Sequence, residues 1–225
     1  MSGRGRGLGI AAVVVGLLGL VLTIGSFAYG REAYGAAIVS SASMTPTYEP
    51  GDRIAYKRVD GSEVRRGDVV MYSAPDRYGF DQPVMQRVIG VGGDHVVCCT
   101  GEGADARITV NGKPLAEPYV KGGDADGGMH KPYDVKVPKG RLFLLGDYRG
   151  NARDSRFFES DHDGTVSTAA VRGRVSDDYT ALGVIGIGMI IGVVLVLTGG
   201  GLGIAAFVVR RRAAVSVPPP WPMQV

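Results

Sequence analysis

Two long apolar runs, one near each end of the chain, restrict most strongly what this sequence can fold into. The run at 8–29 follows Arg4 and Arg6, the run at 181–209 precedes three consecutive arginines at 210–212, and neither run contains a charged residue. About 20 apolar residues are enough for a helix to cross the hydrocarbon core of a bilayer. Both runs are therefore predicted to be transmembrane helices.

The flanking arginines predict the orientation of these helices. Positively charged residues beside membrane helices are enriched on the cytoplasmic side, so both chain ends are expected there, with the main domain outside the plasma membrane. The alternative for the first run is a cleavable signal peptide with small residues at Ser26 and Ala28, but the run is longer than the ~7 to 15 apolar residues usual for such a signal. The expected organisation is a cytoplasmic N-terminus at 1–7, a membrane helix at 8–29, an extracytoplasmic domain at 30–180, a membrane helix at 181–209 and a cytoplasmic basic and proline-rich tail at 210–225.

The charge balance argues against a nucleic-acid partner. The chain carries 25 Lys and Arg against 22 Asp and Glu, a formal net charge of +3. Such a balance produces no strong electrostatic field of either sign. The lipid bilayer is the partner that the composition indicates.

The segment between the apolar runs is predicted to be mainly β. Short β-rich runs recur between turn signals, at 53–58, 68–73, 84–91, 95–99, 108–110, 133–137 and 141–145, without a convincing helical period between them. Asn111-Gly112 is the strongest hairpin signal in the chain. The glycine- and aspartate-rich segment 121–128 is expected to be a mobile loop.

Cys98 and Cys99 are adjacent, so alternation along a strand would send their side chains to opposite faces. The favoured interpretation is one core cysteine and one exposed cysteine. A vicinal disulfide is the alternative in an oxidising exterior, and no metal site or other cofactor is expected.

Several motifs occur in a fixed order after the first apolar run. Residues 39–47 read VSSASMTPT, residues 51–54 GDRI, residues 66–70 RGDVV, residues 84–94 VMQRVIGVGGD and residues 145–156 LGDYRGNARDSR. In this order, behind an N-terminal anchor, they resemble the type I signal peptidases, which are membrane-bound serine endopeptidases with a Ser-Lys dyad. The presence of a second, C-terminal membrane helix resembles the actinobacterial members of this family.

The resemblance implies a β-rich catalytic domain and assigns roles to individual residues. Ser43 matches the nucleophile, and the Ser41 hydroxyl matches a donor of the oxyanion hole, where preorganised hydrogen bonds stabilise the tetrahedral intermediate. Met44, Val84 and Met85 are expected at the substrate, which would dock as an added strand beside residues 84–89.

Two positions depart from the family pattern. The lysine that takes the serine proton is replaced by Gln86, whose carboxamide has no useful basicity. The serine that orients this lysine is replaced by Ala152. Lys57, His95 and His130 are weak candidates for a replacement base.

The charged residues of the last motif and the neighbouring Arg87 are expected to form a structural ion-pair network rather than a metal site; they are Arg87, Asp147, Arg149, Asp154 and Arg156.

Two functions follow from the resemblance. One is a signal peptidase that cleaves signal peptides from exported preproteins at the outer membrane face, with secretion machinery as a further candidate partner. The alternative is a catalytically impaired pseudo-peptidase that binds signal peptides or a secretion partner, because Gln86 and Ala152 replace the base and its orienting serine.

Overall fold

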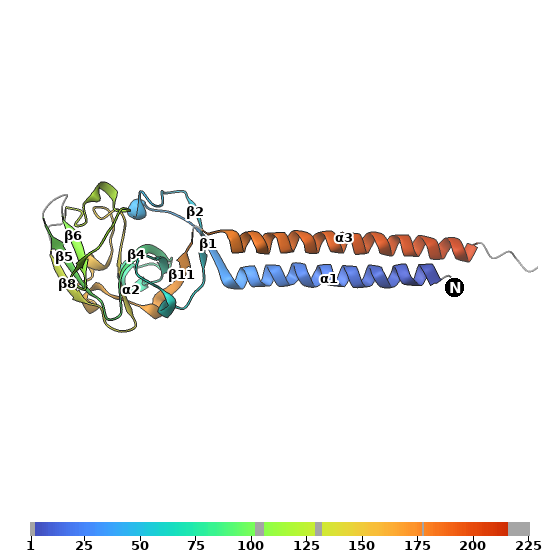
Figure 1. Cartoon of the computed structure of the whole chain (residues 1–225), viewed down its shortest axis with the longest axis horizontal. Helices are drawn as coiled ribbons and strands as arrows, with labels where there is room; N and C mark the ends of the chain where they lie inside the picture. The colour runs from blue at the N-terminus through green and yellow to red at the C-terminus, as the bar shows by residue number, and fades with distance from the viewer. Residues whose placement is uncertain (1–2, 102–105, 129–131, 177, 216–225) are drawn as a thin grey trace, which may run out of the picture. The chain divides into compact units, whose positions relative to one another are not determined.

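The computed structural model describes residues 3–101, 106–128, 132–176 and 178–215, and the chain divides into two compact units (Figure 1). One unit combines the two ends of the chain, 1–32 and 178–225, and the other comprises residues 33–177. The proline-rich tail and His130 lie outside the described residues.

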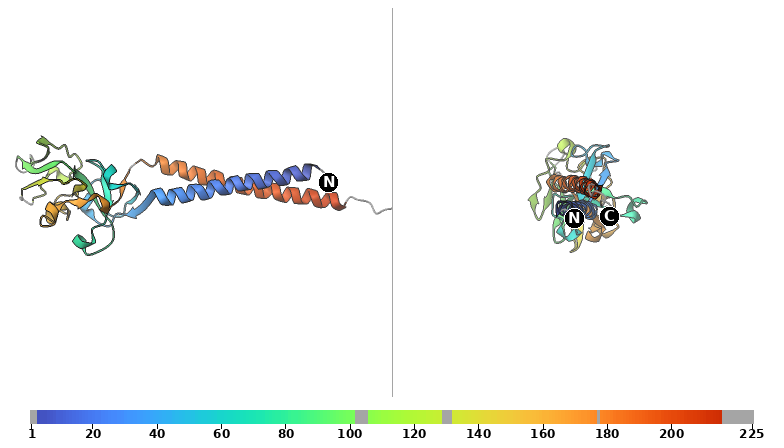
Figure 2. Two further views of the ribbon diagram at one scale, coloured as in Figure 1. Left: turned by 90° about the horizontal axis from the view of Figure 1, so that it is seen from below. Right: turned by 90° about the vertical axis from the view of Figure 1, so that its right-hand side faces the viewer.

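The first unit is a pair of long helices, α1 (Gly3–Ala33) and α3 (Thr180–Val215), which lie side by side and run in opposite directions (Figures 1 and 2). Both contain a stretch long and apolar enough to cross a membrane, at Arg6–Ala33 and Thr180–Arg212. These stretches enclose the apolar runs that the sequence predicted.

Small residues bring α1 and α3 into backbone contact. A Cβ at Gly192 would lie 2.8 Å from the carbonyl oxygen of Gly19, and a Cβ at Gly199 would lie 2.7 Å from the backbone nitrogen of Gly16. Small residues at a helix interface permit this close approach, as in membrane helix pairs generally. The two helices therefore pair within one chain.

The second unit is mainly β, as predicted. A seven-stranded sheet has the order β1-β2-β11-β3-β4-β9-β10, and a four-stranded sheet has the order β7-β6-β5-β8. The strands are β1 (Tyr34–Ile38), β2 (Arg53–Lys57), β3 (Val69–Tyr72), β4 (Val84–Val91), β5 (His95–Thr100), β6 (Arg107–Val110), β7 (Lys113–Pro114), β8 (Tyr133–Lys136), β9 (Arg141–Leu145), β10 (Val166–Ser167) and β11 (Val171–Val175).

The helical elements of this unit are short. They are α2 (Pro75–Tyr78) and the 3-10 turns η1 (Ala42–Met44), η2 (Gly61–Glu63), η4 (Lys121–Gly123), η5 (Ser155–Phe157), η6 (His162–Gly164) and η7 (Thr168–Ala170). Helix α2 was not predicted because it is a single turn, which begins at a proline and ends before Gly79 in the left-handed conformation.

Strand β4 is packed on both faces. Successive side chains of a strand point to opposite faces, and here Val88 belongs to one buried cluster with Tyr72 and Leu144, whereas Ile89 belongs to another with Val96 and Phe143. Both side chains are fully buried. This packing fixes the register of β4 and therefore the position of every side chain along it.

The hairpin between β6 and β7 is confirmed. Asn111 and Gly112 have φ values of 55° and 75°, and Val110 pairs with Lys113 across the turn. A two-residue turn in which both residues have positive φ matches the twist of the flanking strands, which is why Asn-Gly is favoured there.

The expectation of a loose 121–128 loop is wrong in one respect, because this segment packs against the domain. Ala125 is buried in the core cluster that contains Ile89, and its carbonyl oxygen accepts a hydrogen bond from Arg149. A Cβ at Gly127 would lie 2.5 Å from the backbone carbon of Arg149. Because Gly127 has no side chain, the loop can lie directly against the backbone at Arg149.

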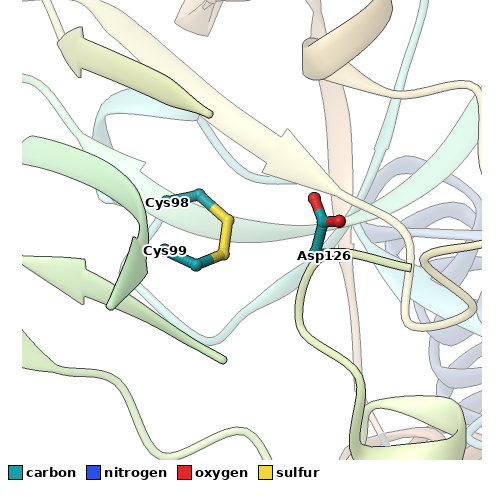
Figure 3. Close-up of side chains that lie close together, drawn as sticks. All are labelled: Cys98, Cys99 and Asp126. Atoms are coloured by element: carbon teal, nitrogen blue, oxygen red, sulfur yellow. A yellow bond between two sulfur atoms is a disulfide. The ribbon is translucent and has the colours of Figure 1, made fainter. Parts of the chain in front are cut away.

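The cysteines also differ from the favoured expectation, because Cys98 and Cys99 form a disulfide (Figure 3). The pairing of β5 with β6 is irregular between Val97 and Thr100, so strict alternation does not apply there. Cys98 is buried and Cys99 is half-buried. Asp126 lies beside both sulfur atoms. Because sulfur atoms in a disulfide are not thiolates, the cluster of Cys98, Cys99 and Asp126 offers a metal ion only the Asp126 carboxylate.

Candidate active site

A pocket of about 320 Å³ lies in the β unit and contains the candidate nucleophile. Its walls come from β1, from the turn that holds Ser41 and Ser43, from the start of β4 with the preceding residues, and from the 151–153 loop. Segments that are far apart in the sequence therefore form one site.

The two serines that the family resemblance singled out lie together. The Oγ atoms of Ser41 and Ser43 are 3.1 Å apart, within hydrogen-bond distance, and both residues line the pocket. The η1 turn that carries Ser43 is tied to the 145–156 segment, because the Tyr148 N–H donates to the Ser43 carbonyl oxygen at 3.0 Å. Apart from Ser41, no side chain in the described part of the chain hydrogen-bonds the Ser43 hydroxyl.

Gln86 lines the same pocket but its amide is engaged elsewhere. The Tyr72 hydroxyl donates to Gln86 Oε1 at 2.7 Å, and Gln86 Nε2 donates to the Arg153 carbonyl oxygen at 3.0 Å and to the Tyr78 hydroxyl at 3.4 Å. The side chain is fully buried. A buried amide whose hydrogen bonds are all made is fixed in place, because breaking them would leave polar atoms unsatisfied.

The two tyrosines that contact Gln86 stay neutral near neutral pH. Burial, reinforced by the neighbouring Tyr78, raises the pKa of Tyr72 well above its ordinary value. Burial likewise raises the pKa of Tyr78. Neither phenol is therefore ionised near neutral pH.

Gln86 and Ala152, the two positions at which the sequence was expected to depart from the family pattern, lie near one another. The Arg153 carbonyl that Gln86 contacts belongs to the residue directly after Ala152. Ala152 is buried, and a Cβ at Gly146 would lie 2.3 Å from the Ala152 Cβ and 2.7 Å from the Ser43 carbonyl oxygen. The absence of a side chain at Gly146 lets this loop close against the serine turn.

The predicted ion-pair residues pair as follows. Arg87 contacts Asp147 through two hydrogen bonds of 2.8 and 2.6 Å. Arg156 contacts the fully buried Asp154, and Arg149 pairs with Glu117. Burial works against the Arg87 charge, but Asp147 offsets it and raises the pKa of Arg87. The Arg87–Asp147 and Arg149–Glu117 pairs connect the 145–156 segment to the rest of the domain, whereas the Arg156–Asp154 pair lies within the segment.

The candidate replacement bases lie away from the pocket as far as the structure describes them. Lys57 is exposed on β2 and His95 pairs with Asp134 at 2.5 Å in the smaller sheet; neither lines the pocket. Of the predicted substrate contacts, Val84 and Met85 line the pocket, whereas Met44 is fully buried in the core with Ile54 and Met71.

Sequence reasoning missed Tyr72, Tyr78, Arg153 and Glu117. The register of the sheet contained part of the signal, since Val70 pairs with Gln86 and the side chain two residues later on β3 belongs to Tyr72. Tyr78 lies in the single turn of α2 and Glu117 in an irregular segment, and neither has enough regular structure for a periodicity to predict the direction of a side chain.

The chain is similar to several known proteins. The family model described as "Signal peptidase, peptidase S26" matches residues 8–179, which is most of the chain. Signal peptidase I V of Bacillus subtilis (strain 168) is 30% identical over 151 residues, or 62% of this chain and 82% of that protein. Signal peptidase I of Bacillus licheniformis is 33% identical over 157 residues, or 65% and 76% of the two chains.

A mycobacterial protein and a solved structure are also similar. The probable signal peptidase I of Mycobacterium leprae (strain TN) is 30% identical over 192 residues, covering 66% of this chain and 62% of its own. A crystal structure of a signal peptidase I from Enterococcus faecalis V583 covers 51% of this chain and 97% of its own, with 25% sequence identity and a TM-score of 0.39.

Proposed function

Because this chain belongs to the signal peptidase S26 family, whose members cleave signal peptides, we propose that it binds signal peptides of exported preproteins in the Ser43 pocket but hydrolyses them poorly. The observation that carries the proposal is the state of Gln86. The residue at the position of the family base is a neutral amide that is hydrogen-bonded to Tyr72, Tyr78 and the Arg153 carbonyl.

The hydrolytic step needs a group that accepts the Ser43 proton. A serine hydroxyl is a weak nucleophile without such a group, and general-base catalysis typically contributes about 10²- to 10⁴-fold to the rate. Among the described side chains, the Ser43 hydroxyl forms a hydrogen bond with the Ser41 hydroxyl alone. We therefore expect cleavage at least ~10²-fold slower than in a family member with the lysine.

Peptide binding does not depend on that base. Strand β1 lies at an edge of the seven-stranded sheet, and residues 37–39 of β1 and its continuation line the pocket opposite residues 82–86. An extended peptide added to an exposed strand gains affinity from main-chain hydrogen bonds and specificity from side-chain pockets. The expected docking strand at 84–89 is only partly open, because β4 pairs with β9 from Arg87 onward; residues 84–86 pair with β3 alone among the described strands and line the pocket.

The membrane arrangement is part of the same proposal. The two apolar helices and the family indicate association with a membrane. We propose that α1 and α3 both cross the plasma membrane. The end of α1 with Arg4 and Arg6 and the end of α3 with the arginines at 210–212 would lie in the cytoplasm, and residues 33–177 at the outer face. That placement would put the pocket where exported preproteins emerge.

A second candidate is a peptidase that turns over without the lysine. The contact between the Ser41 and Ser43 hydroxyls favours it, because the nucleophile and a hydroxyl donor for the oxyanion remain side by side. Such an enzyme would have to pass the serine proton to water.

One assay separates the two candidates. The full-length protein in detergent is incubated with a labelled preprotein peptide, and cleavage is compared between wild type and Ser43→Ala, with binding followed by fluorescence anisotropy. We expect both proteins to bind the peptide and neither to cut it at an appreciable rate. Efficient wild-type cleavage that Ser43→Ala abolishes would establish the second candidate instead.

A further inference from the structure

We propose that the Ser43 pocket prefers peptides that end in a free carboxylate at the serines, the class of molecule released when a signal peptide is cut, over peptides that continue past that point. This inference rests on the proposed peptide-binding function and names the chemical form of the ligand. The protein would then act as a receptor for cleaved signal peptides.

The charge of the pocket favours an anion. Among the described residues that line it, Arg153 is the one charged side chain, and no Asp or Glu is present. The Arg153 guanidinium lies 5.2 Å from the ring centroid of Phe158 and has no carboxylate partner in the described part of the chain. The cation is exposed and available to a ligand.

The carboxylates nearest in sequence do not cancel this charge. Asp154, the next residue, is fully buried and pairs with Arg156 at 2.8 Å, and Asp147 pairs with Arg87 at 2.6 Å. Each of these acids is matched by its own guanidinium. Arg153 is therefore left as the uncompensated charge of the 145–156 loop within the pocket.

The uncharged polar groups of the pocket also suit a carboxylate. When one of the Ser41 and Ser43 hydroxyls donates to the other, the second retains a free O–H donor. A carboxylate accepts hydrogen bonds only, with two oxygens to offer, whereas a peptide bond at the same place has one carbonyl oxygen and no charge. Hydrogen bonds to an ionised acceptor are roughly twice as strong as neutral ones.

Gln86 does not interfere with the binding of a peptide carboxylate in this pocket. A neutral amide does not titrate, and its hydrogen bonds to Tyr72 and the Arg153 carbonyl hold the loop that carries Arg153 beside β4. The substitution that removes the base thus leaves a pocket whose formal charge comes from Arg153 alone among its described lining residues.

The test compares three fluorescein-labelled peptides with the full-length protein in detergent. The first ends in Ala-x-Ala with a free carboxylate, the second is its C-terminal amide, and the third continues for several residues past the same alanine. Binding is measured for wild type, Arg153→Gln and the control Arg172→Gln, an exposed arginine on β11 that does not line the pocket.

We expect wild type and Arg172→Gln to bind the acid at least about tenfold more tightly than the amide, which is the size of one charge-assisted hydrogen bond. Arg153→Gln should remove this preference, so that the acid and the amide bind this variant with equal affinity. The preference should also weaken in higher salt, because an exposed ion pair is screened.

Three results would overturn the inference. Equal affinity for the acid, the amide and the longer peptide would refute it while leaving peptide binding intact. A preference that survives in Arg153→Gln would refute the role of Arg153. Failure of wild type to bind any of the three peptides would refute the proposed function together with the inference.

Discussion

At the scale of single residues, Gln86 and Tyr72 form the contact on which the site depends. Both side chains are buried, and the Tyr72 hydroxyl donates to Gln86 Oε1 at 2.7 Å. The Tyr72 hydroxyl also lies 2.8 Å from the Tyr78 hydroxyl. Gln86, Tyr72 and Tyr78 thus form a connected polar network, of which Gln86 and Tyr78 line the pocket.

A pair of Tyr-to-Phe substitutions tests this network. Tyr72→Phe leaves Gln86 Oε1 without its donor, which should cost about 1 to 3 kcal/mol of unfolding free energy. Tyr133→Phe is the matched control, since the Tyr133 hydroxyl is buried without a hydrogen-bond partner among the described residues. Thermal unfolding of the full-length protein in detergent should show a loss for Tyr72→Phe and no loss for Tyr133→Phe; equal effects would contradict the network.

Restoring the family residues should not by itself restore a good base. In the double variant Gln86→Lys with Ala152→Ser, the Tyr72 hydroxyl would accept a hydrogen bond from the lysine ammonium and so favour the charged form. Adding Tyr72→Phe removes that acceptor, so the lysine pKa should fall. We expect the triple variant to show more Ser43-dependent cleavage, with the rise in its pH-rate profile at lower pH than in the double variant.

The contrary outcome is defined by the same profiles. If the double and triple variants cleave equally and their pH-rate profiles coincide, Tyr72 does not act on the residue at position 86. Adding Ser43→Ala to each variant identifies the cleavage that depends on the nucleophile.

At the scale of elements, the contact between α1 and α3 depends on particular glycines. A Cβ at Gly199 would lie 2.7 Å from the Gly16 nitrogen and 2.8 Å from the Ala12 carbonyl oxygen, whereas a Cβ at Gly200 would have no atom within 4 Å. Gly199→Ala should therefore push the helices apart at a cost of about 1 to 3 kcal/mol, as overpacking usually does.

Gly200→Ala is the control for this substitution, because it changes the same residue type on the neighbouring face. Alanine is the better helix former, so this variant should be neutral or slightly more stable. Disulfide cross-linking of Gly30→Cys with Ile185→Cys reports the pairing, since a Cβ at Gly30 lies 3.3 Å from the Ile185 side chain. Efficient cross-linking in Gly199→Ala, at the level of Gly200→Ala, would contradict the glycine contact.

The turn between β4 and β5 is held by Asp94. Its carboxylate accepts hydrogen bonds from Arg66 at 2.7 Å, from the Asn111 amide at 2.9 Å and from the Val91 N–H at 2.9 Å. Burial works to raise the pKa of Asp94, but these three donors prevail and lower it. The turn is therefore stabilised by the charged form of the acid.

The sign of the pH dependence follows from that shift. The folded-state pKa of Asp94 is lower than the unfolded value of about 3.9, so its contribution is present above that pH and is lost as the pH falls through the folded-state pKa. Asp94→Asn should be less stable than wild type near pH 7, and the difference should shrink below about pH 4. A difference that stays constant in thermal unfolding between pH 7 and pH 3, or a matching effect of the exposed control Asp76→Asn, would contradict this role.

At the scale of the whole molecule, the sequence predicted the elements whose side chains follow a regular pattern. The expected strands at 84–91 and 141–145 have the bounds of β4 and β9, and the Asn111-Gly112 turn is present. Strand β1 was missed because Tyr34–Ile38 is short, contains glycine and alanine, and follows the helix directly. Strand β11 was missed although Val171–Val175 has the alternating pattern of a strand, because the segment is short, has two valines as its apolar side chains and contains a glycine.

The site was predictable in its residues but not in its contacts. The motifs brought Ser41, Ser43 and Gln86 together, and all three line one pocket. The partners of Gln86 were not predictable, because Tyr78 reaches it from a single helical turn and Arg153 contributes a backbone carbonyl. A backbone contact leaves no trace in the type of residue that makes it.

The central claim is that this pocket holds a signal peptide without cutting it, and the chemical state of a bound peptide tests that claim most directly. A preprotein peptide that spans the expected cut is added in slight deficit to the full-length protein, and the complex is isolated after a time sufficient for many turnovers of an active signal peptidase. Mass spectrometry then identifies the peptide. We expect intact peptide from both wild type and Ser43→Ala; peptide cut at one bond in wild type and intact in Ser43→Ala would contradict the account.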